Sequence, residues 1–192
     1  VGPGELLGTS LVLDASKGLV VGHTTTVKSG GTLSLSGGTL DTPLLLLNGG
    51  ASLNAAGETA WPISGMPFSN IAATGTLSIG DANAYGGFDH QGSLSVGNHD
   101  VTLNTKGFAK LGSLTTIDSG ILQAANGIAL GVGNVLTGSG TVEAKVAAGF
   151  GSTIEATGDL DLGSASSVSG FFSDGDLIIN THTVTIHDQN IA

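Results

Sequence analysis

The chain has 192 residues and a formal net charge of −10, with 33 glycines and only 10% charged residues. All five basic residues are lysines, scattered along the sequence, so the basic cluster that nucleic-acid binding requires is absent. The absence of cysteine excludes disulfides and thiolate chemistry, and no apolar run reaches the ~18 residues that span a membrane as a helix.

Short runs with an apolar residue at every second position recur along the chain. This period places the apolar side chains on one face of a β-strand. Gly-Gly, Asn-Gly, Ser-Gly and Asn-His pairs between the runs predict turns, and no long segment has the apolar spacing of a helix. The sequence therefore predicts an all-β fold, with clear alternation at residues 32–36, 75–80, 93–97, 100–104, 141–145, 159–163 and 183–187.

Two segments interrupt this pattern. Residues 57–70 hold the only Trp, the only Met and two of the four prolines. Because proline cannot donate a hydrogen bond to a strand ladder, we expect this segment to be a loop outside the strand array. We expect Trp61 and Phe68 to pack over the array, and they are our candidates for a partner-binding surface. Residues 81–92, with Tyr85 and Phe88, are a second candidate loop.

A long internal repeat selects among the all-β architectures. Residues 75–109 align without gaps on residues 158–192, an offset of 83, and about a third of the pairs are identical. Such translation symmetry is typical of a solenoid, whose coils stack on one another. At roughly 20 residues per coil, the offset corresponds to about four coils. We therefore predict a single parallel β-solenoid domain over residues 1–192, with about nine coils.

Two stretches then suggest a family. "SGGTLSLSGGTLDTPLLLLNGG" (29–50) and "GSGTVEAKV" (138–146) resemble the Gly-Gly-x-Leu strand repeats of large bacterial surface proteins. These include autotransporter-like passenger regions and related extracellular repeat proteins. The resemblance implies a right-handed parallel β-helix at the bacterial cell surface or outside the cell. It also implies a scaffold, adhesin or matrix role, and it provides no catalytic residues.

The histidines and carboxylates are the first candidates for chemistry. His99 and His182 occupy the same repeat position, but four coils would separate them by about 20 Å, too far to bind one metal ion. We expect both to be corner residues. Asp159 and Asp161 share one strand face, which fits a solvated outer face better than a calcium site. The sequence therefore predicts no metal site and no cofactor.

Glycan cleavage is the principal alternative function. Hydrolases need carboxylates that converge on one substrate, and Asp89, Asp174 and Asp176 would converge only in a favourable coil register. We predict that the protein is not an enzyme, and a glycan-binding or glycan-cleaving β-helix remains the alternative. Threonine-rich runs at 23–27, 114–117 and 181–185 lack the strict repetition of a ladder that binds ice or minerals.

The expected function is that of an extracellular structural or adhesive solenoid. No cap is recognisable at the C-terminus, so we expect the last coil to expose a strand edge near Ile178, Ile179, Val184 and Ile186. Unprotected edges pair with other chains. Two hypotheses remain open: the chain is a segment of a longer stalk, or subunits stack end to end into filaments. The expected partners are further copies, cell-surface or matrix components, or polysaccharide.

Overall fold

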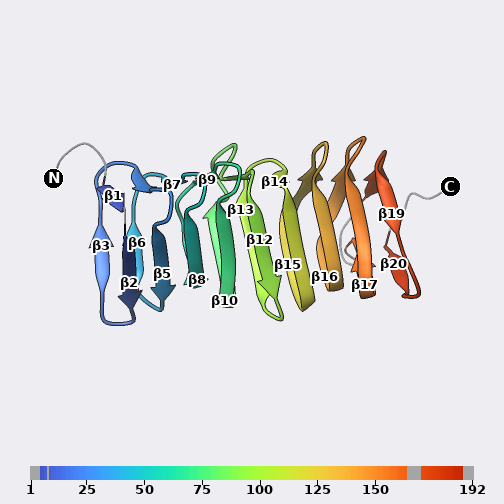
Figure 1. Ribbon diagram of the computed structural model, residues 1–192, viewed down its shortest axis with the longest axis horizontal. Coiled ribbons are helices and arrows are strands. Elements are labelled where there is room, and N and C mark those ends of the chain that lie inside the picture. The colour runs from blue at the N-terminus through green and yellow to red at the C-terminus, as the bar shows by residue number, and fades with distance from the viewer. Residues whose placement is uncertain (1–4, 8, 164–169, 188–192) are drawn as a thin grey trace.

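The computed structural model describes residues 5–7, 9–163 and 170–187, and all regular structure within these residues is β. The strands stack in parallel into a rod whose two ends carry the N- and C-terminal parts of the chain (Figure 1). Successive strands turn through three corners, so the rod has three faces.

Each face is a column of stacked parallel strands, and neighbouring strands pair in register along faces 1 and 2 and along face 3 from β8 onward. Face 1 consists of β1 (Glu5–Leu7), β4 (Thr25–Val27), β7 (Leu45–Leu47), β9 (Ile63–Gly65), β11 (Phe88–His90), β14 (Ala109–Leu111), the ends of β15 (Leu114–Leu130) and β16 (Val135–Ala148), and β18 (Phe171–Ser173). Face 2 consists of β2 (Ser10–Asp14), β5 (Thr32–Ser36), the starts of β8 (Ser52–Glu58) and β10 (Asn70–Asp81), β12 (Ser93–Gly97), the starts of β15, β16 and β17 (Thr153–Leu162), and β19 (Asp176–Ile178). Face 3 begins with a separate two-stranded sheet of β3 (Gly18–Val20) and β6 (Thr39–Asp41). It continues with the ends of β8 and β10, β13 (Asp100–Thr105), the middle of β15 and β16, the end of β17, and β20 (Val184–Ile186).

The 83-residue repeat corresponds to four turns of this solenoid. On face 1 the register passes from Asp89 through Lys110, Ala129 and Ala147 to Phe172, which is four strands further along the rod and 83 positions later. From β1 to β18 the register crosses eight turns, close to the nine coils predicted. The solenoid prediction and the four-coil interpretation of the repeat are confirmed.

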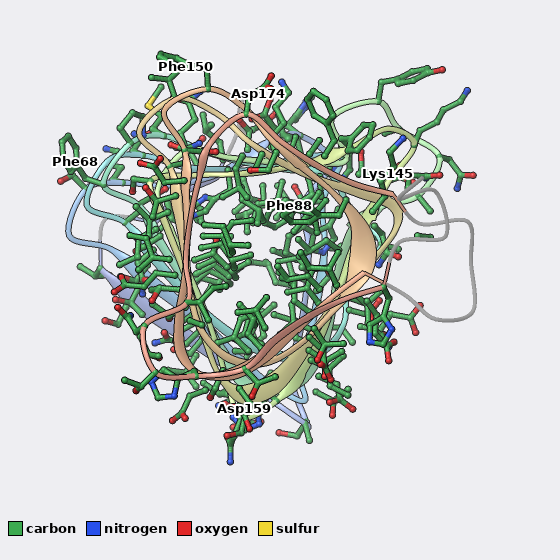
Figure 2. All side chains as sticks on the ribbon, turned by 90° about the vertical axis from the view of Figure 1, so that its right-hand side faces the viewer. Phe68, Phe88, Lys145, Phe150, Asp159 and Asp174 are labelled. Carbon is green, nitrogen blue, oxygen red and sulfur yellow. The ribbon has the colours of Figure 1, made fainter. Side chains whose placement is uncertain are left out.

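The core is a set of apolar ladders inside the rod. Because strand residues alternate in direction, every second residue points inward, and register places these residues on top of one another. One face 2 ladder contains Leu33, Leu53, Ile71, Leu94, Leu136 and Ile154, all buried. The view along the rod shows inward side chains packing around Phe88, while Asp159 lies outside (Figure 2).

The prediction for residues 57–70 was wrong. This segment does not leave the rod, because β9 pairs with β7 on one side and β11 on the other. The two prolines flank β9, and Pro62 still contributes its carbonyl, which accepts a hydrogen bond from the Leu45 N, so no ladder N–H is lost. Trp61 is a core residue, only 4% exposed, and its Nε1–H donates to the carbonyl of Leu40 at 2.8 Å. Phe68, in contrast, is 88% exposed, so it does not pack over the rod as expected.

The second predicted loop is partly confirmed. Residues 82–87 do leave the rod. They lengthen this coil, so that the register partners Ile63 and Phe88 are 25 residues apart. Tyr85 in this loop is exposed, with the Lys106 Nζ 4.8 Å from its ring centroid. Phe88, however, belongs to β11 and is fully buried. The equivalent coil, four coils later, is also 25 residues long, from Val146 to its register partner Phe171.

One buried threonine interrupts the leucine ladder of face 2. Thr115 points inward between Leu94 and Leu136, and its Oγ1 has no hydrogen-bond partner among the described residues. A buried hydroxyl without a partner costs ~1–3 kcal/mol.

We therefore expect Thr115→Val to raise the free energy of unfolding by about 1 kcal/mol, measured by urea denaturation. The control is Thr25→Val, which removes a buried Thr25–Thr42 hydrogen bond and should not stabilise the protein; equal stabilisation by both would contradict this account.

The four residues predicted at the C-terminal edge lie together in the last described turn. Ile178 belongs to β19, Ile179 follows it, and both side chains are exposed. Val184 and Ile186 belong to β20 and are partly buried against the end of the core. Among the described residues, no strand pairs with the outer edge of β19 or β20. The uncapped end predicted near Ala192 lies outside the described residues.

Candidate binding groove

The corner between faces 1 and 2 is uneven, because its turns differ in length. Four-residue turns at 28–31, 48–51, 66–69, 131–134 and 149–152 project from the rod. Two neighbouring turns, at 91–92 and 112–113, have only two residues each. The two short turns lie between the projecting turns 66–69 and 131–134, and the corner is therefore notched at this level.

This notch is a groove of about 510 Å³. Pro67 lines it on the side of turn 66–69, and Gly131 and Asn134 line it on the side of turn 131–134. Its floor is formed by the ends of the face 1 strands and by the short turns, and includes Asp89, His90, Gln91, Lys110, Leu111, Gly112, Ala129 and Leu130. The volume lies within the ~300–1,000 Å³ range of small-molecule sites.

The polar groups of the groove come from adjacent turns. Asp89 and Lys110 are register partners, and the Lys110 Nζ lies 2.8 Å from Asp89 Oδ2. Both side chains remain partly exposed to the groove. Asn134 donates from Nδ2 to the carbonyl of Leu111 at 2.8 Å, which fixes the far wall to the floor. The groove therefore offers one acceptor carboxylate, one ammonium and the free amide of Gln91.

Beneath the groove lies His90, a residue that the sequence did not single out. It occupies an inward position on face 1 and is only 1% exposed. Its Nε2 lies 2.9 Å from the carbonyl of Ser93, so Nε2 carries the hydrogen and donates it. Nδ1 is buried without a partner among the described residues. Burial lowers the pKa of His90, against the opposing effects of the Ser93 carbonyl and the neighbouring Asp89 carboxylate.

Gly65 makes the space that this histidine occupies. A Cβ on Gly65 would overlap the His90 ring at Nδ1. Four turns later, the equivalents of Gly65 and His90 are Ala148 and Ser173. The repeat thus exchanges a Gly–His pair for an Ala–Ser pair, and the imidazole is specific to the groove level.

The neutral His90 makes stability depend on pH. Below the ordinary histidine pKa of 6.5, the unfolded chain takes up a proton that the folded protein, with its lowered pKa, does not. Stability that is complete above pH 6.5 should therefore fall as the pH is lowered towards 5. We expect the wild type to lose up to ~1.4 kcal/mol per pH unit more than His90→Leu in this interval. Parallel pH profiles of the two proteins, from urea denaturation, would contradict this prediction.

Phe68 belongs to turn 66–69, whose Pro67 lines the groove, and it has a strained backbone. It follows Pro67 and has φ of 66°. The corresponding third residue in the other four-residue turns is always glycine, with φ between 72° and 80°: Gly30, Gly50, Gly133 and Gly151. A bulky residue in this left-handed region is rare, because its Cβ crowds the backbone. Figure 2 shows the Phe68 ring outside the ribbon.

The histidines and acids predicted from the sequence do not assemble into a site. His99 and His182 close equivalent corner turns through their backbone N atoms, which donate to Val96 and Ile179. They are four turns apart, about 19 Å at the usual strand spacing. Asp89 is separated from Asp174 and Asp176 by the same four turns. No group of three metal-ligand side chains occurs within the described parts of the chain.

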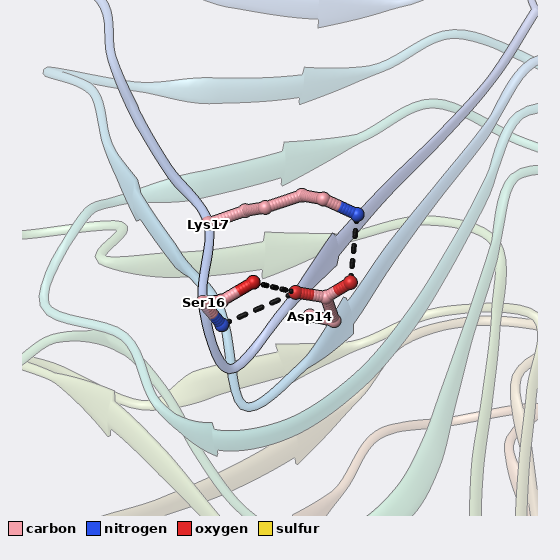
Figure 3. Close-up of polar contacts among 3 residues, drawn as sticks. All are labelled: Asp14, Ser16 and Lys17. Carbon is pink, nitrogen blue, oxygen red and sulfur yellow. Dashed lines mark hydrogen bonds and ion pairs between the residues drawn. The ribbon is translucent and has the colours of Figure 1, made fainter.

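Several of the acids instead cap corner turns. Asp14 accepts hydrogen bonds from the backbone N and Oγ of Ser16 and from the Nζ of Lys17 (Figure 3). These donors, the Lys17 ammonium first, lower the pKa of Asp14 to about 2. In the same way Asp159 accepts a hydrogen bond, at 3.0 Å, from the backbone N of Thr183 in the next coil. Asp159 therefore has a structural partner, while Leu160 and Leu162 are buried as the alternation predicted.

The described part of the chain contains no helix that could cross a membrane. Comparisons of the chain with protein-family models, with curated proteins and with solved structures each found no match.

Proposed function

We propose that the chain is a structural or adhesive β-solenoid of a bacterial surface or extracellular matrix. The observation that carries this proposal is the continuous core, in which the inward residues of each turn pack on those of the next. In such a rod each turn is stabilised by its neighbours, so length can be added without a new core. The strand repeats that resemble those of bacterial surface proteins point in the same direction.

We propose further that this role involves no catalysis. The supporting observation is the separation of the candidate acids. Paired carboxylates of glycoside hydrolases stand ~5–9.5 Å apart, whereas four turns, about 19 Å, separate Asp89 from Asp174 and Asp176. Asp89 is also engaged by Lys110.

Surface exposure can be tested on intact cells of the source organism. An antibody raised against the purified chain should label unpermeabilised cells or their matrix, and treatment of the cells with proteinase K should remove the signal. Labelling that appears only after permeabilisation would overturn the extracellular role.

We also propose that the outer edge of β19 and β20 accepts a further stacked turn. At the last described turn Leu177, Val184 and Ile186 are only partly buried, whereas their counterparts inside the rod are fully buried. Electron microscopy over a range of concentrations should show rods that lengthen by end-to-end association. Ile178→Lys should shift the population towards single rods, because charged side chains block edge pairing; single rods at every concentration would contradict stacking.

A further inference from the structure

We propose that the groove, together with the exposed Phe68 in its wall turn 66–69, binds an uncharged saccharide chain. This inference rests on the adhesive part of the proposed function, to which it adds a site and a class of ligand. It is carried by three observations: the shape of the notch, the polar groups on its floor, and an exposed aromatic residue with a strained backbone in one of its wall turns.

The notch is a groove in which a linear ligand could lie across the rod. Its two walls, turns 66–69 and 131–134, are three strand spacings apart, about 14 Å. Because the two walls are separated along the rod axis, neither of them closes the groove on the side of face 1 or of face 2. A chain molecule can therefore lie across the corner without meeting an end wall.

The floor combines the two properties that sugar rings require. The Asp89 carboxylate accepts hydrogen bonds from hydroxyl groups, the Lys110 ammonium donates to them, and the Gln91 amide does both. Ala129, the register partner of Lys110, lines the same floor and offers an apolar surface to the C–H groups of a sugar ring, whereas Leu130 beside it belongs to the core. Because the ion pair is already formed at 2.8 Å, these groups are held in place before a ligand arrives.

Phe68 supplies an aromatic surface at a cost in backbone strain. A non-glycine residue in the left-handed region costs roughly 1–2 kcal/mol, and the other four-residue turns of this corner avoid that cost by using glycine. Strain retained at an exposed position, with no packing in return, is typical of functional sites. An aromatic ring beside a polar groove can cover one face of a sugar while hydroxyls bond to the floor.

Two other ligand classes fit less well. An acidic polysaccharide would meet a protein of net charge −10, and the one ammonium of the floor is already neutralised by Asp89. A peptide adding as a strand would need free backbone groups, but the short turns are hydrogen-bonded to their neighbours, with the Gln91 N donating to Gly65 and the Ser113 N donating to Gln91. An uncharged saccharide requires neither a positively charged surface nor free backbone groups.

The test is a titration of the whole ¹⁵N-labelled chain with defined oligosaccharides, followed by two-dimensional NMR. The probes are the hexasaccharides of cellulose, chitin, xylan, mannan and starch, with hexagalacturonate as the acidic comparison. We expect at least one neutral probe to shift the backbone amide signals of Gln91, Lys110, Gly112 and Gly131. Signals of the corner between faces 2 and 3, such as Asn98 and Asn180, should not move.

Two variants give the proposal its sharpest test. Phe68→Gly should weaken binding of that probe about ten-fold or more while leaving the melting temperature unchanged or higher, because the strain is relieved. Phe150→Ala removes an equally exposed phenylalanine from the next projecting turn, beyond the groove wall, and should bind like the wild type. Unchanged binding by Phe68→Gly, shifts with hexagalacturonate only, or no shift with any neutral probe would each overturn the proposal. None of these outcomes depends on cell-surface labelling, so this inference and the proposed function can fail separately.

Discussion

Trp61→Ala should lower the free energy of unfolding by about 3–5 kcal/mol, the usual cost of truncating a buried tryptophan. The indole is only 4% exposed and packs in the core between turns. Its truncation also leaves the Leu40 carbonyl without the Nε1–H donor. Urea denaturation followed by far-ultraviolet circular dichroism measures the loss. A change below about 1 kcal/mol would show that Trp61 is not a core residue.

The matched control lies seven residues away in the same segment. The Phe68 side chain is largely exposed, whereas that of Trp61 is buried. The φ of Phe68, 66°, is one that glycine adopts without strain. Phe68→Gly should therefore leave stability unchanged or raise it by up to about 1 kcal/mol, because the relief of strain is offset by the greater chain entropy of glycine. A large loss in this variant would mean that the ring packs on the rod after all.

Gly92→Ala should destabilise the protein by about 3 kcal/mol, at the upper end of the overpacking range. Gly92 forms the short turn between β11 and β12, where a Cβ would overlap the carbonyl oxygen of Ser69. That carbonyl accepts the hydrogen bond from the Ser93 N, so it cannot move without breaking the ladder. The equivalent glycine four coils later, Gly175, is also confined, by the carbonyl and hydroxyl oxygens of Ser152, which explains why glycine recurs at this repeat position.

Gly22→Ala provides the comparison for this variant. A Cβ on Gly22 meets no atom within 4 Å, and the residue does not require the left-handed region. We expect Gly22→Ala to change stability by less than about 0.5 kcal/mol. Thermal melts of the two alanine variants beside the wild type are sufficient, and equal melting temperatures would contradict the close packing of the short turns.

The architecture was predictable because two sequence signals are direct consequences of it. Alternation at 32–36 and 93–97 follows from the two faces of a strand, and the offset of 83 follows from four turns of stacking. The error at residues 57–70 has a physical cause. Solenoid strands of three residues, such as β9, are too short to show alternation, and prolines at both flanks resemble a loop although they leave the ladder intact.

The groove was not predictable for a related reason. It depends on the relative lengths of four corner turns, which are defined only once the register of every strand is known. His90 was missed because β11 is also only three residues long, with Phe88 and His90 as its two inward positions. One signal was present: Phe88 recurs as Phe171 in the repeat, which marks an inward position two residues before His90.

The most direct test of the solenoid uses three residues of one ladder. Ser10, Ser93 and Asp176 are register-linked positions on face 2, each 83 residues and four turns from the next. The chain has no native cysteine, so pairs of cysteine variants can carry spin labels for pulsed electron paramagnetic resonance. The structure predicts about 19 Å for the pairs 10–93 and 93–176 and about 38 Å for 10–176, twice as far. Unequal short distances, or a 10–176 distance no longer than the others, would contradict the stacked rod.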